Sequence, residues 1–263
     1  MIASEKLGLF ILISLLIALS FILASRVEAQ SPTSDRPAVE KINVFAVVSQ
    51  EIESACLDAA RTLMQEEALE SFPLQGYQIH CTLYMTQYPQ GSLEKIAAVV
   101  SEIASNTREF EVKSTGLEIT AGSWFFLNLD RNRNLQTFSD TTVEKLAALR
   151  SPSNFIPDWA KSFPNKVEYI SKYGSPNVYA EFNPHLTLLA QSDEEKLQRF
   201  MKAHSDSSFA KPITGKVVAI GLGIADRNGQ MQNPFKIFPL QQVSRVRDRR
   251  IVVSSGKAHA CSC

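Results

Sequence analysis

The feature that most constrains how this chain folds is a short motif that occurs twice. His80-Cys81-Thr82-Leu83 and His185-Leu186-Thr187-Leu188 both read His-x-Thr-Leu and begin 105 residues apart. Both lie in runs that are typical of β-strands. Because successive side chains of a strand point to opposite faces, each histidine shares a face with its threonine, whereas Cys81 and Leu186 point the other way. Two such strands at one cleft would bring two imidazoles and two hydroxyls around a small anion.

The sequence around each motif is repeated as well. A helix-like segment, a strand-like segment and an apolar run follow each motif in the same order. In the first copy these are Leu93–Ser105, Glu109–Thr120 and Ser123–Leu129, and in the second they are Glu194–His204, Gly215–Ala225 and Pro234–Leu240. A strand at Ile42–Val48 and a helix at Ser54–Glu70 precede the first motif. The duplication predicts two pseudo-repeats, about 42–130 and 178–240, joined by a long loop segment.

These paired motifs and their duplicated surroundings resemble the two-histidine (2H) phosphoesterase superfamily, which includes 2′-5′ RNA ligase-like enzymes and cyclic phosphodiesterases. The resemblance covers about Ile42–Leu240, and both copies of the motif match it fully. It implies an α+β fold, bilobal and duplicated, with two antiparallel sheets facing a central cleft and helices outside. It also implies metal-independent opening of 2′,3′-cyclic phosphates or cleavage of 2′-5′ linkages.

The residue types of the motif suit this chemistry on physical grounds. Hydrolysis of a phosphodiester needs a base that takes a proton from the attacking water and an acid that protonates the leaving oxygen. Histidine supplies either form because its ordinary pKa is about 6.5, so His80 and His185 are the expected acid–base pair. Thr82 and Thr187 would donate hydrogen bonds to the non-bridging phosphate oxygens. The sequence does not tell which histidine is the base.

Other uses of the motif residues are weaker interpretations. A lone histidine on a half-buried strand is more often structural, but two in matched contexts favour catalysis. Zinc usually takes three or four ligands, and the folded region contains neither HExxH nor a closely spaced Cys/His cluster, so we expect no metal and no cofactor. Two functional alternatives stay open: a non-catalytic module of the same fold that binds phosphorylated ligands, and a phosphodiesterase that acts on a non-nucleotide phosphoester.

Two aromatic residues are candidates for substrate binding. Tyr84 follows Thr82 by two positions and is expected on the histidine face, where it would stack on a base or close the cleft. An aromatic that fills the space between the sheets is the alternative. Phe182, between the irregular segment Arg150–Asn177 and the second motif, would line the substrate. The net charge is zero, with 27 basic and 27 acidic residues, which favours a small cyclic nucleotide or RNA-end phosphate over an extended duplex.

The N-terminus predicts export. The apolar run Leu7–Ala24 is followed by Val27 and Ala29, which suit cleavage before Gln30, so residues 1–29 are expected to be a signal peptide and the domain secreted or periplasmic. A membrane anchor that is not cleaved and leaves the domain outside the cytoplasm is the alternative. We expect a linker at 30–41, the 2H phosphoesterase-like domain at 42–243 and a basic, cysteine-containing tail at 244–263.

The cysteines are of interest because disulfides form in oxidising compartments. Cys81 points away from the cleft and Cys56 lies in the helix-like segment Ser54–Glu70, which makes a Cys56–Cys81 disulfide geometrically plausible. Two buried free thiols would look the same in the sequence. Cys261 and Cys263, at the end of the tail, are expected to pair with another chain or to stay free.

Overall fold

The computed structural model describes residues 38–152, 155–232 and 235–242. Contacts divide the chain into two units, Met1–Pro37 and Ala38–Cys263, and only the second contains described residues. The predicted signal peptide, residues 30–37 of the predicted linker, and the tail with its two cysteines lie outside the described residues. Within the described ranges, no helix combines the length and the apolar character that a membrane span requires.

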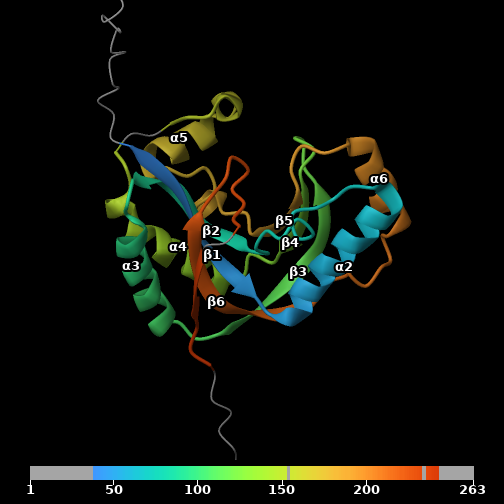
Figure 1. Ribbon diagram of the computed structural model, residues 1–263, viewed down its shortest axis with the longest axis horizontal. Helices are drawn as coiled ribbons and strands as arrows, with labels where there is room; N and C mark the ends of the chain where they lie inside the picture. Colours follow the sequence, from blue (N-terminus) through green and yellow to red (C-terminus); the bar gives the residue numbers. More distant parts are fainter. Residues whose placement is uncertain (1–37, 153–154, 233–234, 243–263) are drawn as a thin grey trace, which may run out of the picture. The chain divides into compact units, whose positions relative to one another are not determined.

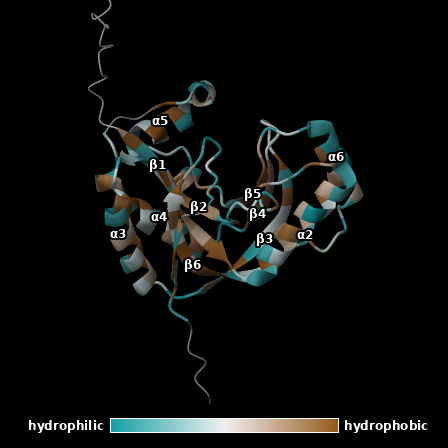
Figure 2. Cartoon of the chain, in the orientation of Figure 1, coloured by the Kyte–Doolittle hydropathy of each residue, from teal (hydrophilic) through white to brown (hydrophobic). Residues whose placement is uncertain are grey.

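Seven strands form one antiparallel sheet in the order β1-β2-β5-β4-β3-β6-β7. They are β1 (Val39–Val48), β2 (Cys81–Pro89), β3 (Phe110–Ile119), β4 (Phe125–Leu129), β5 (His185–Leu189), β6 (Thr214–Ile224) and β7 (Phe235–Pro239). β1 also pairs with β6, which closes six of the strands into a ring. The strands are mainly hydrophobic, as expected where helices cover a sheet (Figure 2). The α+β class predicted from the sequence is therefore confirmed.

The ring has two halves, each built around one motif strand. One half contains β1, β2 and β7, and the other contains β3, β4 and β5. β6 joins them because Thr214–Val217 pair with β3 and Val217–Ile224 pair with β1. Between β2 and β5 there is a single residue pair, Cys81 with Leu186. The two sheets expected from the sequence are thus hydrogen-bonded into one.

In the described part of the chain, α-helices flank the strands (Figure 1). They are α2 (Gln50–Glu67), α3 (Leu93–Ser105), α4 (Arg133–Leu146), α5 (Pro164–Tyr173) and α6 (Glu194–Ala203). α3 and α4 contact β2, β6 and β7, whereas α2 and α6 contact β3, β5 and β6. α3 illustrates the cause: Ile96, Val100 and Ile103 recur every three or four residues and form one buried stripe. The opposite side of each helix is left for hydrophilic residues.

The segment between the two repeats is not the long loop that the sequence predicted, because it contains α4 and α5. α4 begins after Asn132, whose side chain accepts a hydrogen bond from the backbone N–H of Leu135. α5 has Pro164 at its start and ends at Gly174, which has a φ of 72°. These capping residues were visible in the sequence. The predicted linker is also too long, since β1 already begins at Val39.

The two cysteines of the described region are free, buried thiols, so the disulfide alternative is wrong. Cys56 lies on the buried side of α2, and Cys81 is the first residue of β2. Burial raises the pKa of both thiols to about 12. Because the thiolate is the reactive form, both groups act as small apolar side chains in the main core.

Candidate active site

The two motifs meet where β2 and β5 touch. Cys81 pairs with Leu186 in an antiparallel arrangement, so His80 is the cross-strand neighbour of Thr187, and Thr82 that of His185. Cross-strand neighbours have Cβ atoms about 5 Å apart, and diagonal ones such as the two histidines about 7–8 Å. The structure therefore brings together the four residues that the sequence selected, from segments 105 positions apart.

Both imidazoles are fixed in the same way. Nδ1 of His80 lies 2.8 Å from the carbonyl oxygen of Gln78, and Nδ1 of His185 lies 2.7 Å from that of Asn183. A carbonyl oxygen only accepts, so each Nδ1 carries the hydrogen and donates it. In both neutral rings Nε2 is therefore the basic nitrogen, which is the arrangement that proton transfer to or from a substrate requires.

A phenylalanine from the neighbouring strand supports each ring. Phe45 of β1 makes an edge contact with His80, with ring centroids 5.3 Å apart, and Phe126 of β4 stacks on His185 at 3.8 Å. The two positions are equivalent, because Phe45 pairs with Thr82 and Phe126 with Thr187. Gly221 of β6 makes room for Phe45, since a Cβ there would lie 2.5 Å from its ring.

A β-bulge follows each motif and changes which residues reach the site. In β2 the register skips Leu83, between pairs made by Thr82 and Tyr84, and in β5 it skips Leu188 at the equivalent place. A bulge breaks the strict alternation of side chains. For this reason the period of two that selected Tyr84 from the sequence does not hold beyond Thr82.

The structure does not bring either predicted substrate-binding residue to the histidines. Tyr84 is fully buried in the main core, and its hydroxyl donates to the carbonyl oxygen of Tyr173 at 2.7 Å. Phe182 is only 3% exposed and belongs to the same core. Tyr84 thus follows the alternative noted above, an aromatic that fills space. A different aromatic residue, Trp124, precedes β4 and lies against Phe126 at 6.1 Å.

The two histidines differ in burial. His80 is 4% exposed, and burial lowers its pKa to about 4, with the Gln78 carbonyl and Asp226 acting in the opposite direction. His185 is half-buried. Burial also lowers its pKa, against the Asn183 carbonyl and the charge of Glu118. At neutral pH His80 is therefore a neutral imidazole. Each ring has one carboxylate that acts against burial, Asp226 from the loop after β6 for His80 and Glu118 on β3 for His185.

The loop between β6 and β7, residues 225–232, covers the first histidine. The backbone N–H of Gln78 donates to the carbonyl oxygen of Met231 in this loop at 3.0 Å. Met231 also packs with Phe45 and Ala225 in a small apolar cluster. A hollow of about 290 Å³ beside the loop is lined by Tyr77, Ile224, Ala225, Asp226, Gln230 and Gln232. No motif residue lines that hollow.

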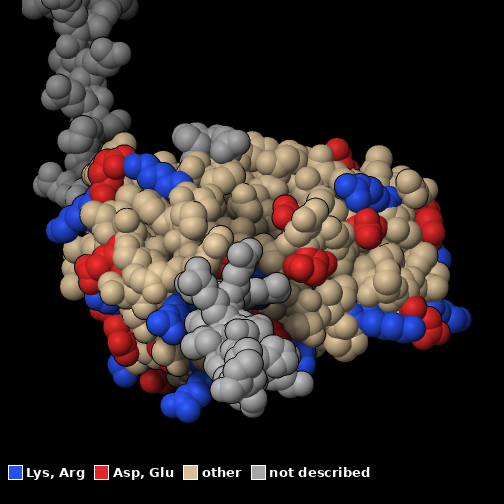
Figure 3. Space-filling view, turned by 90° about the horizontal axis from the view of Figure 1, so that it is seen from below, with Lys and Arg blue, Asp and Glu red and all other residues tan. Residues whose placement is uncertain are grey.

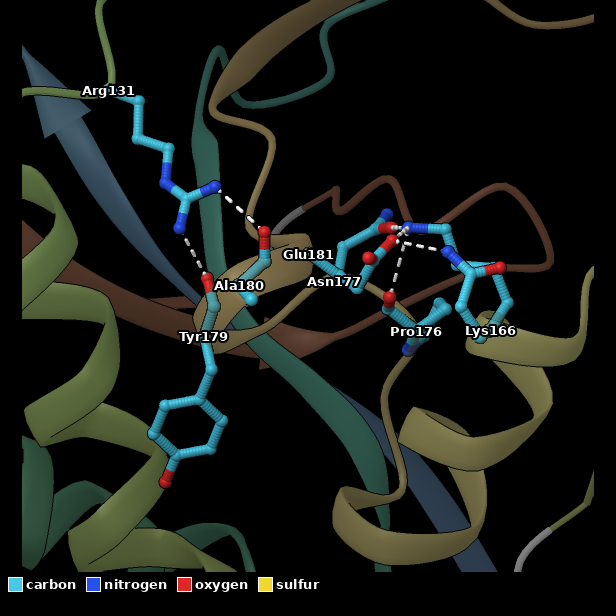
Figure 4. A network of polar contacts seen from close by, with 8 residues as sticks. Arg131, Lys166, Pro176, Asn177, Tyr179, Ala180 and Glu181 are labelled. Atoms are coloured by element: carbon cyan, nitrogen blue, oxygen red, sulfur yellow. Dashed lines mark hydrogen bonds and ion pairs between the residues drawn. The ribbon is translucent and has the colours of Figure 1, made fainter.

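A polar network holds the segment that leads into the second motif (Figure 4). Arg131 donates to the carbonyl oxygens of Tyr179 and Ala180, at 2.7 and 2.8 Å. Lys166 of α5 forms an ion pair with Glu181 at 2.7 Å and also reaches Pro176 and Asn177. The connection between the repeats thereby fixes where β5 begins. Within the described part of the chain, no group of three or more His, Cys, Asp or Glu side chains is placed to hold a metal ion.

Sequence reasoning missed Asn43, Phe45 and Phe126, which contact the two histidines from β1 and β4. Asn43 had a readable signal, because it is a lone polar residue within the apolar strand Ile42–Val48. The phenylalanines had none. They look like any core residue until the strand register is known.

A known protein family matches most of this sequence. The family described as the 2'-5' RNA ligase superfamily matches residues 48–229. No curated protein matches the chain. Similar solved structures include Escherichia coli LigT (14% identity, 78% of this chain and 99% of that one, TM-score 0.46) and TT0787 of Thermus thermophilus (14%, 77% and 98%, 0.43). Usb1 of Kluyveromyces marxianus is another (10%, 77% and 97%, 0.40). Since the family match spans more than half of the sequence and includes both motifs, the chain belongs to the 2'-5' RNA ligase superfamily.

Proposed function

We propose that this protein is a metal-independent phosphodiesterase that opens 2′,3′-cyclic phosphates of nucleotides or RNA ends, or cleaves 2′-5′ linkages. The observation that supports it most is the matched pair of imidazoles, each with Nδ1 donating to a backbone carbonyl, which makes Nε2 the basic nitrogen of each neutral ring. The register at Cys81 and Leu186 places a threonine opposite each histidine, and its hydroxyl would supply a donor for the phosphate oxygens.

The unequal surroundings of the rings assign the two roles. Neutral His80 accepts a proton at Nε2 from the water whose oxygen attacks phosphorus. Protonated His185 gives its Nε2 proton to the ribose oxygen as the bond from that oxygen to phosphorus breaks. His80 ends protonated and His185 neutral, and exchange with solvent restores both. Burial lowers the pKa of both rings. His80 is 4% exposed and His185 is only half-buried, and this deeper burial of His80 is why we give it the role of the base.

The substrate that we propose is small. Basic and acidic side chains are interspersed on the face shown in Figure 3, without a broad region of one sign, and the net charge is zero. Such a surface does not attract a long polyanion. A nucleotide or the end of an RNA needs only local contacts, and Trp124 next to Phe126 offers an aromatic surface on which a base would stack.

The test is turnover by the purified chain, with EDTA present, on the four 2′,3′-cyclic nucleotides and a 2′-5′-linked dinucleotide. We expect activity that resists the chelator and falls by about a hundredfold or more in both His80→Ala and His185→Ala. Binding of nucleotides without turnover would instead support a non-catalytic module. Turnover of other cyclic phosphates alone would move the assignment to a non-nucleotide phosphoester.

We also propose that the chain is exported through its N-terminal segment, as the apolar run Leu7–Ala24 suggests. Sequencing of the mature N-terminus from expressing cells tests this. A mature chain that begins at Gln30 supports cleavage and release. An intact N-terminus in the membrane fraction supports an anchor, and an intact N-terminus in the cytosol contradicts export.

A further inference from the structure

Asn43, on β1, is the polar side chain most closely tied to the first motif. It is fully buried. Its amide nitrogen lies 3.2 Å from Nε2 of His80, 2.9 Å from Oγ1 of Thr82 and 3.0 Å from the carbonyl oxygen of Gly229. One side chain therefore contacts the histidine, the threonine and the loop that covers them.

The partners determine which way this amide points. The Gly229 carbonyl only accepts, and Nε2 of His80 has no hydrogen because Nδ1 carries it. The NH₂ group of Asn43 must therefore face both of them. One of its two hydrogens points to the Gly229 carbonyl, and the other is shared between Oγ1 of Thr82 and Nε2 of His80. Among the described residues, its buried Oδ1 has no hydrogen-bond partner. A donor aimed at Nε2 stabilises the neutral ring relative to the imidazolium, which would place an N–H against an N–H.

The second motif lacks this contact. Asn43 lies two positions before Phe45, and Trp124 lies two positions before the equivalent Phe126. An indole cannot take the place of the amide on His185, whose neighbour Asn128 donates to Glu118 instead. The amide contact is thus specific to the first half.

We propose that Asn43 is a positioning residue that holds His80 in its neutral, proton-accepting form, aligns Thr82 with it, and couples both to the loop 225–232. The assignment of His80 as the base rests on the proposed function, but the effect of Asn43 on the protonation of His80 does not. The other groups that face His80 are His185 from β5 and Asp226 from the loop, and Lys41 of β1 faces Asp226.

The direct test is an NMR titration of the histidine side-chain nitrogens in the full chain, which needs no substrate. Asn43→Asp keeps the shape but replaces the donor with an acceptor. We expect it to raise the pKa of His80 by one unit or more, because a carboxylate stabilises the imidazolium. Asn43→Ala, which adds no charge, should raise it by less. Asn128→Asp is the matched control, because it adds the same charge next to His185. It should change the pKa of His185 rather than that of His80.

A kinetic arm separates a positioning role from a structural one. If Asn43 sets the protonation of His80, the acidic limb of kcat/KM moves to higher pH in Asn43→Asp by the same amount as the titration. The proposal is overturned if Asn43→Asp lowers kcat/KM by the same factor at every pH. It is also overturned if the titration of His80 is unchanged in both Asn43 variants. Absence of turnover in the unmodified chain would contradict the proposed function, and the NMR titration would still decide the role of Asn43.

Discussion

The two halves of the molecule agree in their motif strands and differ in the strands beside them. β2 and β5 share the bulge after threonine, the bond from Nδ1 to a carbonyl, and a supporting phenylalanine. Their neighbours have different origins. β4 follows β3 as a hairpin, whereas β1 comes from the start of the domain. The sequence repeat aligned β4 with β7, yet β7 lies on the outer edge of β6, and β1 occupies the position next to β2.

This difference shows where a duplicated site becomes asymmetric. The strands that carry the reacting groups are alike, and the flanking strands supply Asn43 on one side and Trp124 on the other. In the proposed function an acid and a base come from the same residue type in different surroundings, which is a common way to separate two pKa values.

The largest effect is expected from removing each histidine on two substrates that differ in the leaving group. On a 2′,3′-cyclic nucleotide, His80→Ala and His185→Ala should both lose about a hundredfold or more in kcat. A nitrophenyl phosphodiester has a leaving group that needs little protonation. On this substrate, the kcat of His185→Ala should return to within about tenfold of that of the unmodified chain, and the kcat of His80→Ala should not. If only His80→Ala recovered its kcat on this substrate, the roles of acid and base would be reversed. If both variants lost kcat equally, the two histidines would not differ in role.

The pH dependence of kcat/KM is the next test of the unequal pair. The base must be neutral, so activity should fall as pH drops through the pKa of His80, about 4. The acid must be protonated, so activity should also fall as pH rises through the pKa of His185, which lies below the ordinary 6.5. We expect a bell-shaped profile with a mildly acidic optimum. An optimum above pH 7 would contradict this.

Stability should report the buried histidine without any substrate. The folded-state pKa of His80, about 4, lies below the unfolded value of 6.5. Its contribution is therefore present above pH 6.5 and is lost as pH falls toward 4, by about 3 kcal/mol at most. Denaturant unfolding at pH 7 and pH 4 measures it. Gln at position 80 cannot be protonated, so His80→Gln should lose less stability than the unmodified chain between pH 7 and pH 4. An equal loss in both proteins would mean that His80 has the same pKa in the folded and unfolded states.

A smaller effect is expected at the aromatic surface of the second half. If a base stacks on Trp124, Trp124→Ala should weaken binding by about 1–3 kcal/mol, seen as a higher KM for nucleotides. Because the indole does not touch the transferred proton, kcat should change little. Asn43→Ala, at the equivalent position of the first half, should instead lower kcat and change KM little. A change in kcat alone for Trp124→Ala would contradict the stacking role.

The smallest effect concerns the thiols. Cys56 and Cys81 are buried with pKa values of about 12, so a thiol reagent should not modify them in the folded protein at neutral pH. Mass spectrometry of peptides before and after unfolding checks this. Rapid labelling of Cys81 under native conditions would show that the contact between β2 and β5 opens.

Most strands and helices could be predicted from the sequence because their apolar spacing is strong. The helix predicted at Leu93–Ser105 has those bounds, and the strand predicted at Glu109–Thr120 is one residue shorter at each end. The motif residues were found because they repeat. Tyr84 was misplaced because a bulge leaves no mark in the residue pattern. α4 was missed although Asn132 caps it and Phe138 and Leu146 follow at helical spacing.

The single pair between β2 and β5 has a mechanical consequence. In the proposed function His80 acts from one half of the ring and His185 from the other, and Cys81 and Leu186 are the only described residues that pair β2 with β5. In the described sheet, β6 runs through both halves, because it pairs with β1 and with β3. A bend in β6 would change the separation of the two rings without altering either one. The alignment that the proposed function requires would thus depend on a strand that bears neither histidine.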